Sequence, residues 1–457
     1  MKVIMKSKLS DKYNVAVPRY TSYPTVPYWE ADSFSNDRWR EAVRTSFRES
    51  NAAEGISLYI HLPFCESLCT YCGCNTRITR NHKVEAPYIA AVLKEWALYL
   101  KCFDGKPVIR ELHLGGGTPT FFSPEHLEIL INGLLKHASV HERAEFSFEA
   151  HPGNTTKAHL DTLYRLGFKR LSLGIQDFDP KVQLMINRIQ SYQDVERATE
   201  EARSAGYRSV NYDLIYGLPF QSLEGLVDTM DSVLKLRPDR IAFYSYAHVP
   251  WVRPGQRRYT EQDLPSADLK GKLYETGREM LKAGGYTEIG MDHFTLQTDS
   301  LFTAEKDGRL HRNFMGYTDQ YSRLMIGLGV SAISDTWTGF AQNVKKVEDY
   351  LELVNNGEIP VFKGHILSAE DLVLRQHILN IMCKGTTSWF SAELQHVSLW
   401  EGLQRMQELE ADGLVEITDQ SLRVTILGKR FLRNICMTLD ARLWRNQPAT
   451  QLFSMAV

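Results

Sequence analysis

Between Ile56 and Ala247, short β-rich runs alternate with amphipathic helical stretches. Six such repeats indicate a parallel sheet whose strands are joined by right-handed helical crossovers. A partial or full (β/α) barrel and a doubly wound sheet both fit this α/β pattern. We favour a partial barrel of about six parallel strands, because polar residues follow nearly every run and barrels place their active sites at that end. The runs are Ile56–Phe64, Ile109–Gly115, Glu145–Ala150, Arg170–Gln176, Ser209–Gly217 and Arg240–His248.

The barrel is expected to occupy residues 51–345, between an arm and a tail. In the arm, residues 1–50, two prolines lie in Val17–Thr25 and predict an extended segment, and Asp37–Arg48 is expected to be helical. We expect Gly284–Ser334 to form loops and edge structure, because it is rich in Gly and aromatic residues.

The tail, residues 346–457, has the pattern of a mainly helical domain with one hairpin. An apolar stripe, Trp400, Leu403, Met406 and Leu409, predicts a helix, and two short runs around Asp419–Ser421 predict the hairpin. This combination resembles a winged-helix domain. With 53 Lys+Arg against 55 Asp+Glu, the chain has no basic excess for nucleic acid. We therefore interpret the tail as a packing domain; a DNA-binding regulator is the weakest alternative.

Seven cysteines are distributed unevenly along the chain, with four between Cys65 and Cys74. An odd, clustered set indicates a metal or cluster site in a reducing compartment rather than disulfides. Cys102, Cys383 and Cys436 are expected to be small core residues. The cationic start lacks an apolar segment, and no run approaches the ~20 apolar residues of a membrane helix. We expect a cytoplasmic protein without a membrane or nucleic-acid partner.

The first run is followed by a Cys-x3-Cys-x2-Cys spacing formed by Cys65, Cys69 and Cys72. Structural zinc sites usually join two separated ligand pairs, and no such partner pair follows here. Three thiolates on one short loop suit three corners of an iron–sulfur cubane whose fourth iron stays open. A zinc loop or unliganded thiols remain alternatives. Cys74 is either a fourth ligand or has another role, such as contacting the neighbouring pocket.

This spacing, with the aromatic Tyr71 before the third cysteine, resembles the radical S-adenosylmethionine (SAM) superfamily. The resemblance implies a [4Fe-4S] cluster on Cys65, Cys69 and Cys72, whose open iron binds SAM. It also implies that one electron cleaves SAM to a 5′-deoxyadenosyl radical. The protein's task is then to position SAM and exclude water, with no catalytic residue beyond the cluster and SAM.

Further motifs lie at the carboxyl ends of successive runs, where polar groups can hold a ribose, a carboxylate and an adenine. Consecutive glycines in Leu114–Thr120 allow a ligand close to the backbone. Taken singly, each polar residue there also fits a strand-end cap or a surface ion pair. Together with the resemblance, these motifs predict a SAM site formed by Tyr59, Tyr71, Cys74, Gly116, Gly117, Thr118, Glu149, Gln176, Arg188, Asp213, Ala247 and Ile333.

From about residue 13 to the tail, the chain is similar to the oxygen-independent coproporphyrinogen III oxidases. The similarity is carried by Pro18–Thr25, Cys72–Asn75, Asn211–Pro219, Tyr246–Pro250, Gly290–Phe294, Leu310–Thr318 and Gly327–Ser334. It implies oxidative decarboxylation of two propionates of coproporphyrinogen III to vinyl groups, giving protoporphyrinogen IX for heme biosynthesis. The chain departs from the pattern at Met315, where some members have Gln, and at Asp319, where a second Thr is common.

A substrate with four carboxylates is best bound by Arg guanidinium groups, which can pair with a carboxylate through two hydrogen bonds, and by hydroxyl groups that donate hydrogen bonds. We predict Arg19, Tyr20 and Tyr23 on the arm, with His311 and Arg312, as substrate residues. The arm would then act as a substrate lid, or alternatively would only pack. The other expected partners are an unidentified electron donor and acceptor, and the protein is expected to be a monomer.

Two rival functions share the three-cysteine loop. A heme chaperone of the same superfamily would bind heme without decarboxylation, but it usually lacks the Cys74 extension and the arm. A radical SAM enzyme that methylates heme and opens its ring would act on heme itself. Incubation with heme or with coproporphyrinogen III separates these functions.

Overall fold

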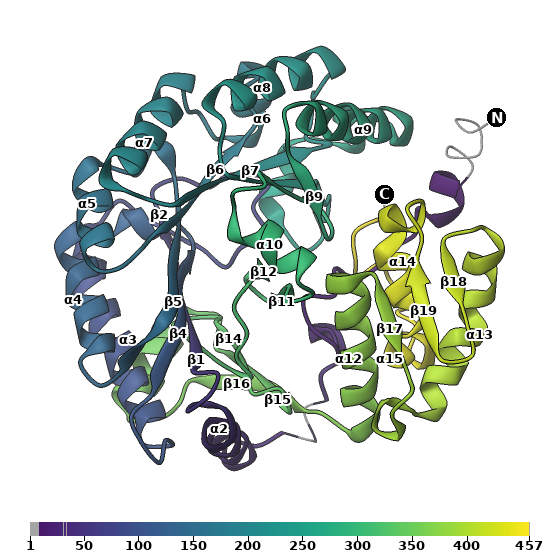
Figure 1. Cartoon of the computed structure of the whole chain (residues 1–457). Helices are drawn as coiled ribbons and strands as arrows, with labels where there is room; N and C mark the ends of the chain where they lie inside the picture. Colours follow the sequence, from purple (N-terminus) through teal and green to yellow (C-terminus); the bar gives the residue numbers. More distant parts are fainter. Residues whose placement is uncertain (1–8, 31, 33, 457) are drawn as a thin grey trace.

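A curved sheet surrounded by helices dominates the computed structural model, which describes residues 9–30, 32 and 34–456 (Figure 1). The sheet has 12 strands in the order β16-β15-β14-β13-β1-β4-β5-β6-β7-β8-β10-β9. Its central strands, from β13 to β8, all pair in parallel. The two edge strands of this order do not pair with each other in the described sheet, so the barrel is partial.

The six predicted runs are confirmed as parallel strands. They are β1 (Ile56–Leu62), β4 (Val108–Gly116), β5 (Ser139–Ala150), β6 (Arg170–Gln176), β7 (Ser209–Tyr216) and β8 (Arg240–Ser245). Each strand after β1 is added on the same side of the one before it. This order excludes a doubly wound sheet, in which the direction of addition reverses.

A seventh parallel strand, β13 (Leu324–Leu328), corrects the expectation of loops for that region. All five of its residues are buried, and it pairs with β1. Antiparallel strands extend both edges of the sheet: β14 (Ile333–Asp335), β15 (Gly339–Asn343) and β16 (Val361–Ile366) on one side, β10 (His293–Thr295) and β9 (Thr287–Ile289) on the other. A separate hairpin, β11 (His311–Asn313) and β12 (Gly316–Thr318), lies inside the ring (Figure 1).

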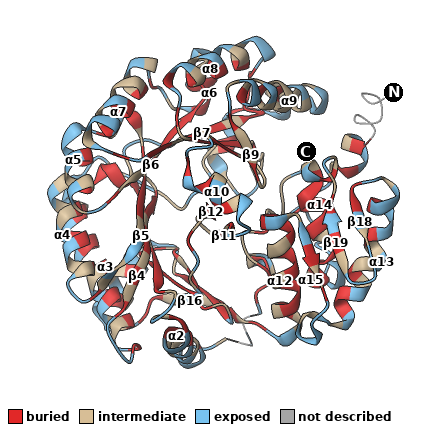
Figure 2. Ribbon diagram, in the orientation of Figure 1, coloured by how far each residue is buried: buried red, intermediate tan, exposed pale blue. Residues whose placement is uncertain are grey.

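Amphipathic helices cover the outside of the barrel, with buried residues facing the sheet and exposed residues facing out (Figure 2). Helix α7 is typical: a capping box at Ser191 begins it, and Val195, Ala198 and Ala202 are buried. The outer helices are α2 (Asn36–Ser50), α3 (Glu85–Leu100), α4 (Pro124–Leu135), α5 (Lys157–Arg165), α6 (Pro180–Ile186), α7 (Tyr192–Ala205), α8 (Leu223–Leu236), α9 (Ala267–Ala283) and α11 (Val347–Asn355). The short helix α10 (Ser300–Lys306) lies within the ring, next to β12 (Figure 1).

The C-terminal region forms a second group of elements beside the opening of the barrel (Figure 1). Its helices are α12 (Ala369–Lys384), α13 (Val397–Ala411), α14 (Leu432–Thr438) and α15 (Ala441–Arg445). The predicted hairpin is β18 (Val415–Ile417) with β19 (Ser421–Val424), and β17 (Thr386–Ser388) joins it. Because β16 still belongs to the main sheet, this group begins with α12 rather than at residue 346. In the part of the chain that the structure describes, no helix has the length and apolarity needed to cross a membrane.

The N-terminal arm packs into this C-terminal group. Tyr13, Val17, Tyr20 and Tyr23 share one hydrophobic cluster with residues of α12, α13 and α14. Arg433 of α14 donates hydrogen bonds to the backbone carbonyls of Val17 and Pro18. The arm is therefore part of the core of the C-terminal group.

Candidate active site

The loop that carries the cysteine cluster is closed by two very short strands. β2 (Phe64–Cys65) pairs in parallel with β3 (Arg77–Ile78), which brings the two ends of the loop side by side. Within the loop, the backbone N–H of Cys72 donates to the carbonyl of Cys69 at 3.1 Å. Cys65, Cys69 and Cys72 are partly exposed and line a cavity of about 440 Å³ at the carboxyl ends of the barrel strands.

The three thiols of the loop are the donors that a cluster or a metal ion would use. Among the described residues, no three His, Cys, Asp or Glu side chains converge closely enough to ligate one ion. A structural zinc site requires four ligands around one ion. In an iron–sulfur cubane each cysteine binds a different iron, so the three thiols have to lie apart around one space. Cys65, Cys69 and Cys72 line one cavity from one short loop, as three ligands of a cubane would.

The surroundings of the three sulfur atoms differ. Burial raises the pKa of Cys65 to about 11, and its Sγ lies 3.3 Å from the hydroxyl of Thr118. The hydrogen bond with Cys74 lowers the pKa of Cys72 to about 6. The backbone N–H of Cys74 also donates to the Cys72 sulfur at 3.4 Å. Cys74 therefore lies in the same cavity as a direct neighbour of one predicted ligand.

The glycine-rich end of β4 forms one wall of the cavity. The N–H of Gly117 donates to the Leu62 carbonyl at 2.8 Å, and that of Thr118 donates to the Phe64 carbonyl at 3.1 Å. A Cβ atom on Gly117 would come within 2.6 Å of the Pro63 backbone. The glycine at this position is thus required by the close packing of β4 against the start of the cysteine loop.

Charged side chains of β5 and β7 line the same cavity. The Glu149 carboxylate accepts from the N–H of Gly116 at 3.4 Å. The Asp213 carboxylate accepts from the hydroxyl of Ser172 and from the side-chain amide of Asn211, both at 2.9 Å. Burial raises the pKa of Asp213 to about 6, and the nearby charge of Glu149 adds to this effect. The two carboxylates are held as hydrogen-bond acceptors on neighbouring parts of the wall.

An irregularity in β6 directs further groups into the cavity. The pairing of β6 with β7 shifts register between Gly174 and Gln176, and Gln176 adopts a positive φ of 68°. Bulges of this kind often occur next to active sites, where they redirect a side chain. Arg188 donates to the Gly174 carbonyl through Nε at 3.1 Å, and its Nη1 lies 3.7 Å from the Cys69 sulfur.

Most of the residues predicted to bind the cofactor therefore line one cavity, and three of them, Tyr59, Ala247 and Ile333, are not part of its lining. The ring of Tyr59 lies beside Gly115, and its hydroxyl is 3.2 Å from Nδ1 of His61. The carbonyl of Ala247 accepts from Gln256, whose amide also bonds the carbonyl of Tyr71. Ile333 begins β14, on the far side of β13 from β1.

The structure adds three residues that the sequence analysis did not identify. Asn187 donates to the Leu68 carbonyl at 2.7 Å and so fixes the cysteine loop. His151 also lines the cavity, and burial lowers its pKa to about 3, which leaves the ring neutral. Tyr244 at the end of β8 borders both this cavity and a second, polar cavity of about 210 Å³ inside the barrel. Tyr244 lies in the middle of the predicted run Arg240–His248, so the strand end observed at Ser245 is what places it at the cavity.

Comparison with known proteins agrees with this geometry. Residues 59–233 match the Radical SAM superfamily. The chain is 37% identical over 442 residues to the oxygen-independent coproporphyrinogen III oxidase of Pseudomonas aeruginosa, covering 94% of this chain and 95% of the relative. The Escherichia coli protein of that name is 37% identical over 454 residues, with 98% of each chain covered. A solved structure of coproporphyrinogen III oxidase from Escherichia coli, described as a radical SAM enzyme, matches with a TM-score of 0.87 at 35% identity, covering 93% of this chain and 97% of that one.

The chain belongs to the oxygen-independent coproporphyrinogen III oxidases. This assignment confirms the expected family and partial radical SAM barrel. The cofactors of this radical SAM enzyme are a [4Fe-4S] cluster and SAM. The cavity fits both groups, because it combines three thiols of one short loop with a wall of backbone, carboxylate and guanidinium groups.

The predicted substrate residues of this oxidase are not gathered in one place. Arg19 reaches the barrel, where it donates to the Ser245 carbonyl at 2.8 Å. Tyr20 and Tyr23 are buried in the C-terminal group, and the Tyr20 hydroxyl donates to Asp440 at 3.1 Å. His311 lines a different cavity, of about 600 Å³, between β11 and α12.

Arg312 lies next to His311 in β11 but is buried, with its guanidinium 4.6 Å from the centre of the Tyr317 ring. Among the described residues, its Nε and Nη1 have no hydrogen-bond partner.

The two residues that depart from the family pattern, Met315 and Asp319, line different cavities. Met315 lines the polar cavity inside the barrel together with His293 and Glu149. A thioether there offers no hydrogen-bond donor, unlike the amide of a Gln. Asp319 lies in the cavity that His311 borders, and its carboxylate accepts from Gln320 at 3.1 Å. Of the two departures, the one at Met315 therefore changes a surface close to the cofactor cavity.

Proposed function

We propose that this protein converts two propionate side chains of coproporphyrinogen III to vinyl groups and so produces protoporphyrinogen IX for heme biosynthesis. Each conversion releases CO₂, one proton and two electrons from a –CH₂–CH₂–COO⁻ group. The observation that carries the proposal is the shared cavity of the cysteine loop and the strand-end polar residues, in a chain similar over its whole length to enzymes of this name.

The residues have distinct roles in this proposal. When bound, the [4Fe-4S] cluster and SAM would supply the one-electron chemistry that removes a hydrogen atom from the propionate. Cys65, Cys69 and Cys72 would hold three irons. Glu149 and Asp213 would accept hydrogen bonds from polar groups of SAM, and Arg188 would keep a positive charge beside the cluster. The remaining electron leaves to an acceptor that is still to be identified.

We further propose that the enzyme acts as a cytoplasmic monomer that receives electrons from a separate donor. The seven cysteines are all free thiols, as suits a reducing compartment. We also retain the prediction that the arm covers the substrate, with Arg19 as its contact to the barrel mouth. Size-exclusion chromatography with light scattering tests the oligomeric state directly.

Anaerobic turnover of coproporphyrinogen III with SAM and a reductant, followed by the mass of the product, tests the function. We expect loss of two CO₂ and four hydrogen atoms per ring, with methionine formed from SAM. Cys69→Ser should abolish product and methionine, whereas Cys102→Ser, at a buried thiol outside the cluster loop, should keep both. Unchanged substrate combined with methylation or tight binding of heme would contradict the proposal and favour a rival function.

A further inference from the structure

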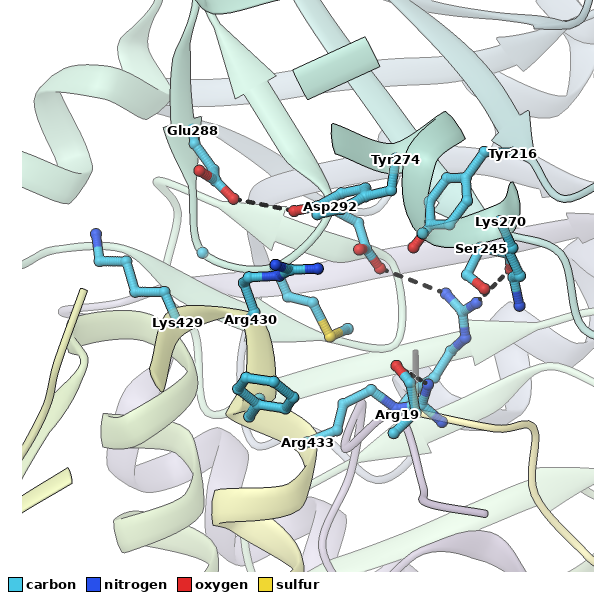
Figure 3. A pocket seen from close by; sticks show the side chains of 15 residues that line it. Arg19, Tyr216, Ser245, Lys270, Tyr274, Glu288, Asp292, Lys429, Arg430 and Arg433 are labelled. Carbon is cyan, nitrogen blue, oxygen red and sulfur yellow. Dashed lines mark hydrogen bonds and ion pairs between the residues drawn. The ribbon is translucent and has the colours of Figure 1, made fainter. Parts of the chain in front are cut away.

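A small cleft rich in cations lies where the arm, the barrel and the C-terminal group meet (Figure 3). Its volume is about 50 Å³, and its lining includes Arg19 of the arm, Lys270 of α9, Asp292 before β10 and Arg433 of α14. Figure 3 shows Arg19 reaching between Asp292 and Ser245 from the side on which Arg433 lies. This cleft is separate from the cofactor cavity.

Two of the acidic side chains near the cleft are neutralised by other cations. Glu288 lies 2.8 Å from Arg278 and 3.1 Å from Lys282, and Arg430 pairs with Glu275 at 2.8 Å. The lining holds four further cations, Arg19, Lys270, Lys429 and Arg433, beside the single carboxylate of Asp292. Three of them, Arg19, Lys270 and Arg433, come from the arm, the barrel and α14.

The three cations are bound mainly by backbone carbonyls. Lys270 donates to the Tyr246 carbonyl at 3.3 Å, and Arg433 donates to the carbonyls of the arm and the tail. Of the residues that the structure describes, no carboxylate forms an ion pair with Lys270 or Arg433, and Asp292 lies 3.7 Å from Arg19. Carbonyls satisfy hydrogen bonds but leave a positive charge uncompensated, which is unfavourable for groups removed from water.

The electrostatic state of the cleft agrees with this excess of charge. Burial, together with the charges of Arg19 and Arg433, lowers the pKa of Lys270 to about 8. Arg433 is only 6% exposed, and burial lowers its pKa to about 10. An anion entering the cleft would raise the pKa of both groups toward their ordinary values and offset their mutual repulsion.

The cleft is close to the place of reaction. The guanidinium of Arg19 lies 5.9 Å from the centre of the Tyr244 ring, and Tyr244 borders the cofactor cavity. One aromatic ring therefore separates the cationic cleft from the cavity. A substrate with several carboxylate arms could place one arm on each side of this ring.

We propose that this cleft binds the carboxylate of a propionate that is not reacting, and so orients the tetrapyrrole while another propionate faces the cofactors. The inference rests on the proposed function, because that function supplies the substrate with four carboxylates. The size of the cleft supports it, since about 50 Å³ suits one carboxylate and excludes the ring. Arg19 and Lys270 would contact the carboxylate, Arg433 would position the arm, and Asp292 would compete with the ligand.

The test uses the full-length protein reconstituted with its cluster and two substitutions of opposite effect. Lys270→Gln should weaken binding of the tetracarboxylate roughly tenfold, the size of one charge-assisted hydrogen bond. Asp292→Asn should strengthen binding by removing the competing carboxylate. Asn also tolerates the left-handed φ of 65° at position 292. The matched control is Lys272→Gln on the same helix, whose lysine pairs with Asp268 at the surface.

Binding is measured by fluorescence with coproporphyrin III, the stable oxidised ring, and with its tetramethyl ester. We expect weaker binding of the free acid to Lys270→Gln and unchanged binding of the ester. If the cleft binds only free anions and not the carboxylates of the ring, the free acid and the ester should bind with the same affinity in every variant. That result would overturn the proposal. Equal binding of the free acid to Lys270→Gln and Lys272→Gln would overturn it as well.

Turnover of coproporphyrinogen III by the same variants separates this inference from the proposed function. With normal wild-type turnover, Lys270→Gln should raise KM while leaving kcat and SAM cleavage nearly unchanged. Turnover without any effect of Lys270→Gln contradicts the cleft and leaves the function standing. Cleft-dependent binding without decarboxylation contradicts the function and leaves the cleft standing.

Discussion

Arg188 connects the end of β6 to the cysteine loop: its Nη1 lies 3.7 Å from the sulfur of Cys69, while its Nε donates to the carbonyl of Gly174 at 3.1 Å. The charge of the guanidinium is thereby fixed beside a predicted cluster ligand. Fixed charges near a cluster and hydrogen bonds to its sulfurs set its reduction potential.

Arg188→Lys should keep the positive charge but lose the planar guanidinium, which bonds the Gly174 carbonyl and the Cys69 sulfur at the same time. We expect SAM binding to weaken about tenfold, because Lys cannot bond both of these groups together and the wall of the cavity loses a charge-assisted hydrogen bond. The reduction potential of the cluster should also change. Equilibrium binding of SAM and a potentiometric titration measure these effects. Arg165→Lys, at a surface ion pair with Glu128, is the control. If both variants bind SAM alike, Arg188 has no part in the cofactor site.

The raised pKa of Asp213 leads to a prediction of how SAM affinity depends on pH. Burial raises the pKa of this carboxyl to about 6, so it ionises only above that pH. As an acceptor for SAM it should act when ionised, and affinity should rise as pH increases through about 6. Asp213→Asn should bind SAM more weakly at pH 7 and should lose this pH step. A pH step of the same size in the variant would assign the step to another group.

The raised pKa of Asp213 also affects the free energy of unfolding, which should fall rather than rise with increasing pH. The folded-state pKa of Asp213 lies above its ordinary value of 3.8, so the folded protein holds the proton more tightly than the unfolded chain. The free energy of unfolding should therefore contain a contribution from Asp213 that is present at low pH and is lost as pH rises through about 6. Urea unfolding of wild type and Asp213→Asn between about pH 3.5 and about pH 7 measures it, with most of the change expected between the ordinary pKa of 3.8 and about 6.

Two glycines near the cysteine loop form a matched pair for mutation. An added Cβ on Gly117 would come within 2.6 Å of the Pro63 backbone, whereas one on Gly73 would meet nothing within 4 Å. Gly117→Ala should lower the free energy of unfolding by about 1–3 kcal/mol through overpacking, and it should reduce iron incorporation. Gly73→Ala should change neither. Thermal unfolding and iron analysis check both variants, and equal iron content would contradict the packing role of Gly117.

The sequence predicted those parts of the fold and site that depend on local patterns. Alternating runs identified six strands, and cysteine spacing identified the cluster loop. β13 was missed because Leu324–Leu328 is short, contains Gly327 and pairs with a strand more than 250 residues earlier in the chain, so nothing local marks it. Tyr20 and Tyr23 were predicted to bind substrate from their hydroxyl groups, but residue type does not determine the direction of a side chain. Packing against α12–α14 determines it.

The arm provides the last prediction, which concerns its proposed role as a lid. Tyr20 has a positive φ of 48°, unusual for a bulky residue, and its buried hydroxyl donates to Asp440 at 3.1 Å. Tyr20→Phe removes this bond and should lower the free energy of unfolding by about 1 kcal/mol. Tyr28→Phe removes an exposed bond to the Asn446 carbonyl and should have a smaller effect.

Kinetics of the same two variants separate a lid from a packed arm. A lid has to leave the C-terminal core during each turnover, so loosening Tyr20 should change kcat or KM for coproporphyrinogen III while SAM affinity stays constant. A fixed arm should show only the loss of stability, because Arg19 would still reach Ser245. Unchanged kcat and KM in Tyr20→Phe, together with lower stability, would therefore assign the arm a packing role and contradict the lid.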